Sequence, residues 1–76
     1  MIVMGRDFFI VLRGYDIAEV DRALEAARQA LASGSAVARG EARAALAGAQ
    51  FPVKLRGYDR AEVDQAVAEL AGQLDG

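Results

Sequence analysis

The feature that most constrains this chain is an internal repeat. Residues 8–21 return, 43 positions later, as residues 51–64, and Phe, Leu, Arg, Gly, Tyr, Asp, Ala, Glu, Val and Asp are identical in both copies. A repeat of this kind indicates one supersecondary unit present twice. We therefore divide the 76-residue chain, taken as a single domain, into repeat one (8–32), a linker (33–50) and repeat two (51–74).

Each repeat begins with the pattern of a short strand. In residues 51–55 large apolar side chains alternate with Pro52 and Lys54, and this period of two is typical of a half-buried strand. The same register in residues 8–12 places the first, third and fifth side chains against the core. Gly14 and Gly57 follow these segments, and because glycine adopts positive φ without Cβ strain, we predict a tight turn at each.

A helix-starting sequence, Gly-Tyr-Asp-x-x-Glu-Val, comes next in both repeats. Aspartate is a preferred N-cap, the glutamate three residues later completes a capping box, and the tyrosine and valine form a hydrophobic staple. The residues in these roles are Gly14, Tyr15, Asp16, Glu19 and Val20 in repeat one, and Gly57, Tyr58, Asp59, Glu62 and Val63 in repeat two. Because turn, cap and staple account for every residue type in this sequence, we interpret these positions as structural.

Apolar residues then recur at spacings of four, three and four, which predicts helices over residues 17–32 and 60–74. The linker is expected to be a flexible tether with a short helix at 41–47, bounded by Gly40 and Gly48, since glycine inside a helix costs roughly 1 kcal/mol. We therefore expect a mainly α-helical fold with two short extended segments. Its tandem strand–turn–helix repeats should pack with pseudo-twofold symmetry, as an intrachain pair.

Composition excludes most chemistry. The chain has no Cys and no His, so it offers no disulfide, no thiolate metal site and no histidine base for a serine nucleophile. The carboxylates of Asp16, Glu19 and Asp21 do not indicate a metal site, because the helix cap uses the first two. Nine basic against eleven acidic residues give a net charge of −2, which argues against nucleic-acid binding. We expect a non-enzymatic, cytoplasmic protein with no catalytic residue, cofactor or metal.

The repeated pattern Phe-x-x-x-Leu-Arg-Gly-Tyr-Asp-x-x-Glu-Val-Asp resembles the N-terminal domain of the DivIVA family, bacterial scaffold proteins of cell division and polar growth. The tandem arrangement is similar to that of short actinobacterial DivIVA-domain proteins. The resemblance implies attachment to the inner membrane, with an apolar residue inserting into lipid and the following arginine meeting headgroups. The matching positions are Leu12 and Arg13, and Leu55 and Arg56. Well-studied members carry a bulky aromatic residue where this chain has leucine, and a coiled coil normally follows the domain.

Two interpretations of Arg13 and Arg56 stay open. Each arginine can form an ion pair with Asp21 or Asp64 on the nearby helix, which contributes at most about 1 kcal/mol at an exposed site. Alternatively, each can contact a phosphate headgroup of an anionic membrane surface, with an energy of about 1 kcal/mol per residue.

Phe9 and Val11 distinguish repeat one, because proline and lysine occupy the matching positions in repeat two. If they point away from the core, they form an exposed apolar patch together with Ile2 and Met4. We interpret this patch as a partner surface, most simply for a second copy in a homodimer. The alternative is that the middle segment of the same chain covers it.

The sequence thus predicts a DivIVA-like interaction module linked to bacterial cell division or polar wall growth. Its expected partners are itself and unidentified division or wall-growth proteins. Two alternatives stay open: a lipid-binding module located peripherally at the inner membrane, and a small dimeric adaptor or regulator unrelated to division.

Overall fold

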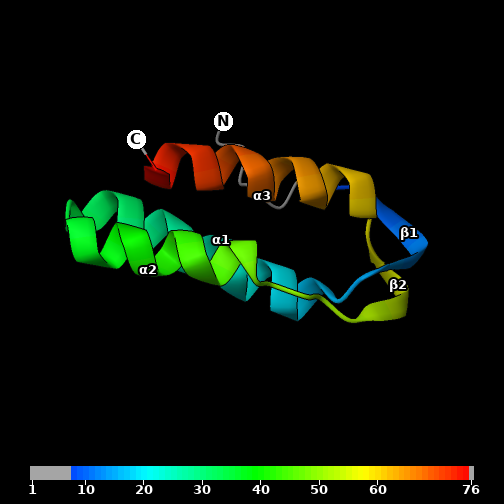
Figure 1. Ribbon diagram of the computed structural model, residues 1–76. Coiled ribbons are helices and arrows are strands. Elements are labelled where there is room, and N and C mark those ends of the chain that lie inside the picture. The colour runs from blue at the N-terminus through cyan, green and yellow to red at the C-terminus, as the bar shows by residue number, and fades with distance from the viewer. Residues whose placement is uncertain (1–7, 76) are drawn as a thin grey trace, which may run out of the picture.

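The computed structural model describes residues 8–75. Its elements follow in the order β1 (Ile10–Tyr15), α1 (Ile17–Ser33), α2 (Ala36–Ala47), β2 (Val53–Tyr58) and α3 (Arg60–Asp75). The helices of this range lie side by side, and the two strands lie together at one end of them (Figure 1). The expected mainly helical fold with two short extended segments is confirmed.

The strands β1 and β2 form a two-stranded sheet. Ile10 pairs with Tyr58 and Tyr15 pairs with Val53, so the partner number falls as β1 is followed forwards and the strands run antiparallel. The ladder is irregular along its length, and Arg13 in the middle of β1 has a φ of 63°.

The pairing continues one residue beyond the end of each strand. The backbone N–H of Asp16 donates to the carbonyl of Pro52 at 2.8 Å, and the N–H of Asp59 donates to the carbonyl of Phe9 at 2.8 Å. Each helix cap is therefore attached to the segment that begins the other repeat.

Gly14 and Gly57 lie within the strands rather than in tight turns. Among the described glycines only Gly34 has positive φ, at 72°. A Cβ placed on Gly14 would overlap the backbone of Gly57 and Tyr58, and a Cβ on Gly57 would overlap the backbone of Gly14 and Tyr15. The predicted turns were wrong because close approach of two backbones, not positive φ, is what requires glycine here.

Both repeat helices begin where the sequence indicated. Asp16 Oδ1 accepts the N–H of Glu19 at 3.1 Å, and Asp59 Oδ2 accepts the N–H of Glu62 at 3.1 Å. The reciprocal half of the expected capping box does not form, because the N–H groups of both caps donate across the sheet. Glu62 Oε1 instead accepts the backbone N–H of Phe9 at 2.9 Å, which adds another bond between the repeats.

The linker was predicted to be a flexible tether with a helix at 41–47; that helix is present and ends where expected, but it begins five residues earlier, and the segment is packed rather than a flexible tether. Gly34 ends α1 in the left-handed conformation, Ser35 caps α2 through a 3.1 Å bond from Ala38 N–H, and α2 runs from Ala36 to Ala47. Gly40 lies inside α2 rather than at its boundary. Because α2 packs against both α1 and α3, tertiary packing outweighs the glycine penalty.

The core consists of two clusters along the helices. Near the sheet, Val20 and Val63 are fully buried with Leu24 and Tyr58, and Phe8, Tyr15 and Phe51 pack around them. Farther from the sheet, the buried residues are Ala27 and Ala30 of α1, Leu46 of α2 and Leu74 of α3. The first cluster therefore joins the two repeats, and the second seats the linker helix.

Candidate interaction surface at the strand tip

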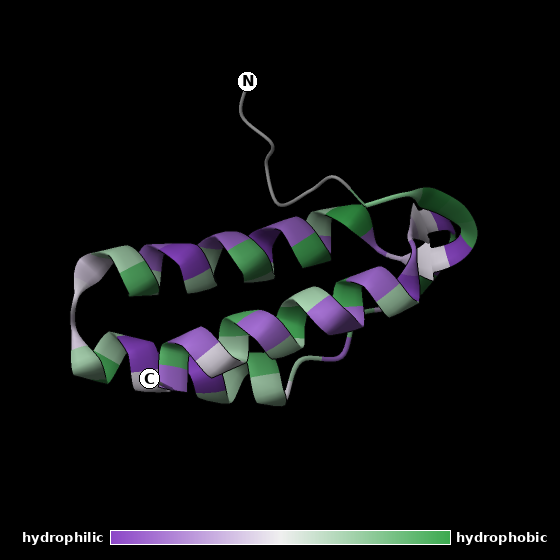
Figure 2. Ribbon diagram, turned by 90° about the horizontal axis from the view of Figure 1, so that it is seen from above, coloured by the Kyte–Doolittle hydropathy of each residue, from purple (hydrophilic) through white to green (hydrophobic). Residues whose placement is uncertain are grey.

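Exposed apolar side chains gather on the two strands, at a surface that we call the tip. Its apolar members are Phe9 (73% exposed), Ile10 (46%), Leu12 (73%), Val53 (45%) and Leu55 (75%), and its cations are Arg13, Lys54 and Arg56. Figure 2 shows β1 at this end coloured as largely hydrophobic. Clusters of exposed apolar residues are typical of surfaces that contact a protein or a membrane.

The sequence predicted that the apolar side chains of the strands would face the core, and for most of them this was wrong. Phe8 and Phe51, the first residue of each segment, pack on the core, while Ile10, Leu12 and their counterparts in β2 are exposed. The strands extend past the ends of the helices, so no helix covers either face of the sheet there (Figure 1). The alternation of apolar and polar residues along a strand does not show where the helices stop covering the sheet.

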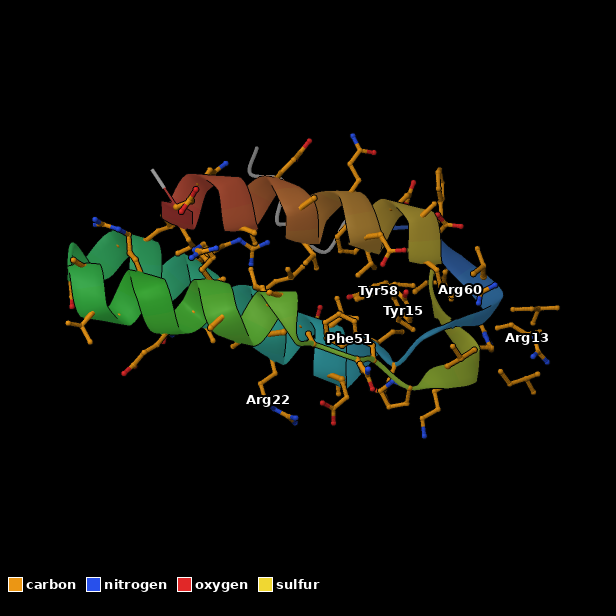
Figure 3. All side chains as sticks on the ribbon, viewed as in Figure 1. Arg13, Tyr15, Arg22, Phe51, Tyr58 and Arg60 are labelled. Carbon is orange, nitrogen blue, oxygen red and sulfur yellow. The ribbon has the colours of Figure 1, made fainter. Side chains whose placement is uncertain are left out.

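The cations of the tip stand among these apolar residues. Arg13 extends from the strands away from the helices (Figure 3). Neither Arg13 nor Arg56 forms an ion pair with any carboxylate among the described residues, and Lys54 Nζ lies 3.8 Å from Asp16 Oδ2. A small groove of about 190 Å³ lies between Arg13 and Lys54, with Val53 and Leu55 in its wall.

The ion pairs of the arginines with Asp21 and Asp64, one of the two interpretations left open, do not form; those carboxylates bind tyrosines instead. Tyr58 Oη donates to Asp21 Oδ1 at 2.8 Å, and Tyr15 Oη donates to Asp64 Oδ1 at 3.0 Å. Each tyrosine thus binds the helix of the other repeat. Desolvation, followed by the hydrogen bond and charge of Asp64, raises the pKa of the Tyr15 phenol above its ordinary 10.0.

Aromatic contacts also cross between the repeats. The ring of Phe8 packs edge-on against Tyr58 with centroids 5.1 Å apart, and Tyr15 packs tilted against Phe51 at 5.4 Å. The sequence reading assigned the tyrosines to a local staple and missed this role. The signal available was the aspartate at the end of both copies, which the sequence analysis paired with the arginines instead.

The predicted partner patch in repeat one is only partly present. Phe9 is exposed and Val11 is half-buried, while Ile2 and Met4 lie outside the described residues. No described segment covers Phe9, so the alternative in which the middle of the chain shields it does not hold for this side chain.

Within residues 8–75 no group of three or more acidic, histidine or cysteine side chains is placed to hold a metal ion. In the same range no helix combines the length and the apolar character needed to cross a bilayer. The chain matches no protein-family model, no curated protein and no solved structure.

Proposed function

We propose that this protein is a non-enzymatic, DivIVA-like interaction module that attaches peripherally to an anionic membrane surface through the tip. The observation that carries the proposal is that Leu12 and Leu55 are about three-quarters exposed beside Arg13 and Arg56, two arginines without a described carboxylate partner. Apolar side chains that can enter the acyl boundary, next to cations that can meet phosphates, are what a bilayer interface binds.

A pseudo-twofold pairing of the two repeats within one chain is part of this proposal. It is supported by contacts that exchange when the repeats are exchanged: Tyr58 to Asp21 and Tyr15 to Asp64 are the same pair of positions, 43 residues apart. The pairing brings Leu12 and Arg13 to the same end of the molecule as Leu55 and Arg56, since Leu12 pairs with Arg56 in the sheet. Two weak sites on one rigid body bind more tightly than either alone.

A role in bacterial cell division or polar wall growth belongs to the same proposal and rests on the shared motif. In that role the protein would occupy the membrane at a growth or division site and bring other proteins to it. Its protein partners would be division or wall-growth factors that bind surfaces other than the tip.

The test is sedimentation of the full chain with vesicles of phosphatidylglycerol and phosphatidylcholine, beside vesicles of phosphatidylcholine alone. We expect binding to the anionic vesicles that weakens with salt, and loss of binding in the double variant Leu12→Ser, Leu55→Ser. Burying a leucine contributes roughly 1.5–3 kcal/mol, so two leucines that are three-quarters exposed contribute about 2–4 kcal/mol together. That corresponds to a loss of affinity on the order of 30- to 1000-fold.

The matched control is Val37→Ser, because Val37 is 72% exposed on α2, away from the strands. Vesicle binding should be unchanged in this variant. Absence of wild-type binding to anionic vesicles, or an equal loss in the control, would contradict the proposal.

The adaptor alternative uses the same surface differently and predicts a homodimer through Phe9. Light scattering on wild type and on Phe9→Ser, without lipid, distinguishes the two. A wild-type dimer that dissociates in the variant, combined with no vesicle binding, would replace membrane attachment by self-association.

A further inference from the structure

A second surface lies mainly on the helices and shares no residue with the tip. It is an open groove of about 620 Å³ between α1 and α3. Phe8, Leu31 and Leu70 supply its large apolar side chains, and Ala32 and Ala66, one on each helix, leave it wide. No residue of α2 is among those that line it, so it lies on a side of the helix pair that α2 does not cover.

The same two helices already seat one helix. Ala38, Ala42 and Leu46 of α2 pack into the cluster that contains Ala27 of α1 and Leu74 of α3. These two small residues and one large residue are spaced four positions apart, so they form a stripe on one face of α2. The filled groove therefore shows which shape of ligand the α1–α3 pair accepts.

The open groove is the counterpart of the filled one under exchange of the repeats. Residues 43 positions apart occupy the same place in the two repeats. The residues of α1 and α3 that surround α2 therefore have counterparts on the other helix: Ala66 for Ala23, Leu70 for Ala27, Arg28 for Ala71 and Leu31 for Leu74. All four counterparts line the open groove. A pseudo-twofold pair of repeats has two such grooves, but one chain has a single linker between its repeats and can fill only one.

The open groove differs from its counterpart mainly in polarity. Arg28, Glu69 and Gln73 line it where Ala71, Ala26 and Ala30 stand at the exchanged positions. Arg28 forms an ion pair with Glu25, with Nη1 and Oε1 3.6 Å apart. Glu69 forms no ion pair with a described residue. Polar side chains at the rim of an apolar groove are typical of a site that holds water when it is empty and binds its ligand reversibly.

We propose that this groove is the docking site for an amphipathic helix of a partner protein. That helix carries a stripe of small, small and large apolar residues at four-residue spacing, as α2 does, and lies between α1 and α3. The proposal rests on the inferred exchange symmetry of the repeats and is independent of membrane attachment by the tip.

The probe is a synthetic peptide of residues 35–48, acetylated and amidated. A peptide this short is a marginal helix in water, so a hydrocarbon link between positions 37 and 41, which are exposed in α2, holds it helical without touching the stripe. It is titrated, without lipid, into the isotope-labelled full chain. We expect saturable shifts of the backbone amides of Leu31, Ala66 and Leu70.

Ala66→Arg should weaken peptide binding by about tenfold or more, because it places an unpaired charge where the helix must dock. Ala68→Arg is the matched control, since Ala68 is exposed on α3 and does not line the groove. Both variants are first compared with wild type by thermal melting. If Ala66→Arg melts early, Ala32→Arg tests the opposite, exposed wall of the groove in its place.

Four results would each overturn the proposal. The first is that the groove amides show no shift at any peptide concentration. The second is that the shifts occur around Leu46 and Ala27, which would mean that the peptide exchanges with α2. The third is that Ala68→Arg weakens binding as much as Ala66→Arg does. The fourth is that dilution of the protein without peptide changes the chemical shifts of the groove amides, which would mean that a second copy occupies the groove. None of these results bears on vesicle binding, so failure here is distinguishable from failure at the tip.

Discussion

Replacing Tyr58 with phenylalanine removes the hydroxyl that donates to Asp21 Oδ1 at 2.8 Å and leaves the ring in place. The ring is only 4% exposed and keeps its edge-on contact with Phe8. A hydrogen bond to a charged acceptor contributes about 1.5–3 kcal/mol, and Asp21 is partly exposed, so we expect a loss of about 1.5 kcal/mol. In a domain of this size that lowers the Tm by roughly 6–12 °C.

Tyr15→Phe is the matched variant, because Tyr15 occupies the same position in repeat one. Its bond to Asp64 is longer, at 3.0 Å, and exposed, so we expect a loss below about 1 kcal/mol. The pH dependence distinguishes it further. Because the pKa of Tyr15 is raised in the folded state, the unfolded chain loses this proton first, and the stabilisation present at lower pH is lost as pH rises above about 10. Tyr15→Phe should lack this component of the alkaline loss.

Thermal melts and urea titrations of both variants, with Asp21→Asn alone and combined with Tyr58→Phe, measure the pair directly. The combined variant should lose less than the sum of the single variants, because both remove one interaction. If Tyr58→Phe melts with wild type, or if Tyr15→Phe is the more damaging change, then the crossed hydroxyl bonds do not hold the repeats together in the way we infer.

The helix caps, the close approach of the two strands and the glycine inside α2 give further stability predictions. Asp16→Ala and Asp59→Ala should each cost about 1 kcal/mol in urea titrations, since each removes the acceptor of an orphan helix N–H; equal stability to wild type would refute the cap assignment. Gly57→Ala should lower the free energy of unfolding by about 3 kcal/mol or more, because its Cβ would overlap the backbone of β1. Gly40 has open space around it, so Gly40→Ala should raise the free energy of unfolding by up to about 1 kcal/mol. Loss of stability in Gly40→Ala would contradict the helical assignment of that residue.

The helix starts could be predicted because they are encoded locally. An aspartate followed three residues later by a backbone N–H within its reach needs only its own turn, and both caps form at the expected residues. The buried valines one turn later, Val20 and Val63, could likewise be placed from spacing alone. These are the elements on which local propensity and burial agree.

The strand faces and the capping glutamates could not be predicted, because they depend on the other repeat. Whether Leu12 is buried is decided by where the helices end in space, and alternation carries no information on that. Glu62 was expected to turn back to its own cap, but the N–H of that cap donates to the Phe9 carbonyl across the sheet. A residue with one local and one distant partner available cannot be assigned from its own segment.

The linker helix was predicted too short because Gly40 was taken as its boundary, since glycine weakens a helix. An alanine-rich segment with Gly40 inside it has little intrinsic reason to stay helical as an isolated twelve-residue piece. The groove between α1 and α3 stabilises it, because Leu46 is buried there against Ala27 and Leu74. The helix is therefore a consequence of the pairing of the repeats.

The tip and the open groove share no residue, although Phe8 at one end of the groove is the chain neighbour of Phe9 in the tip. From there the groove extends along the helices, and Leu31 lies fourteen residues beyond Ile17, the first residue of α1, about 21 Å at 1.5 Å per residue. A headgroup layer is only roughly 5–8 Å thick, so a tip inserted in the interface leaves the far part of the groove clear of lipid. A helix docked there would be held parallel to α1 and α3, with its partner protein on the solvent side. Attachment and recruitment would then use different residues, and the Leu12 and Ala66 variants should fail in one assay each.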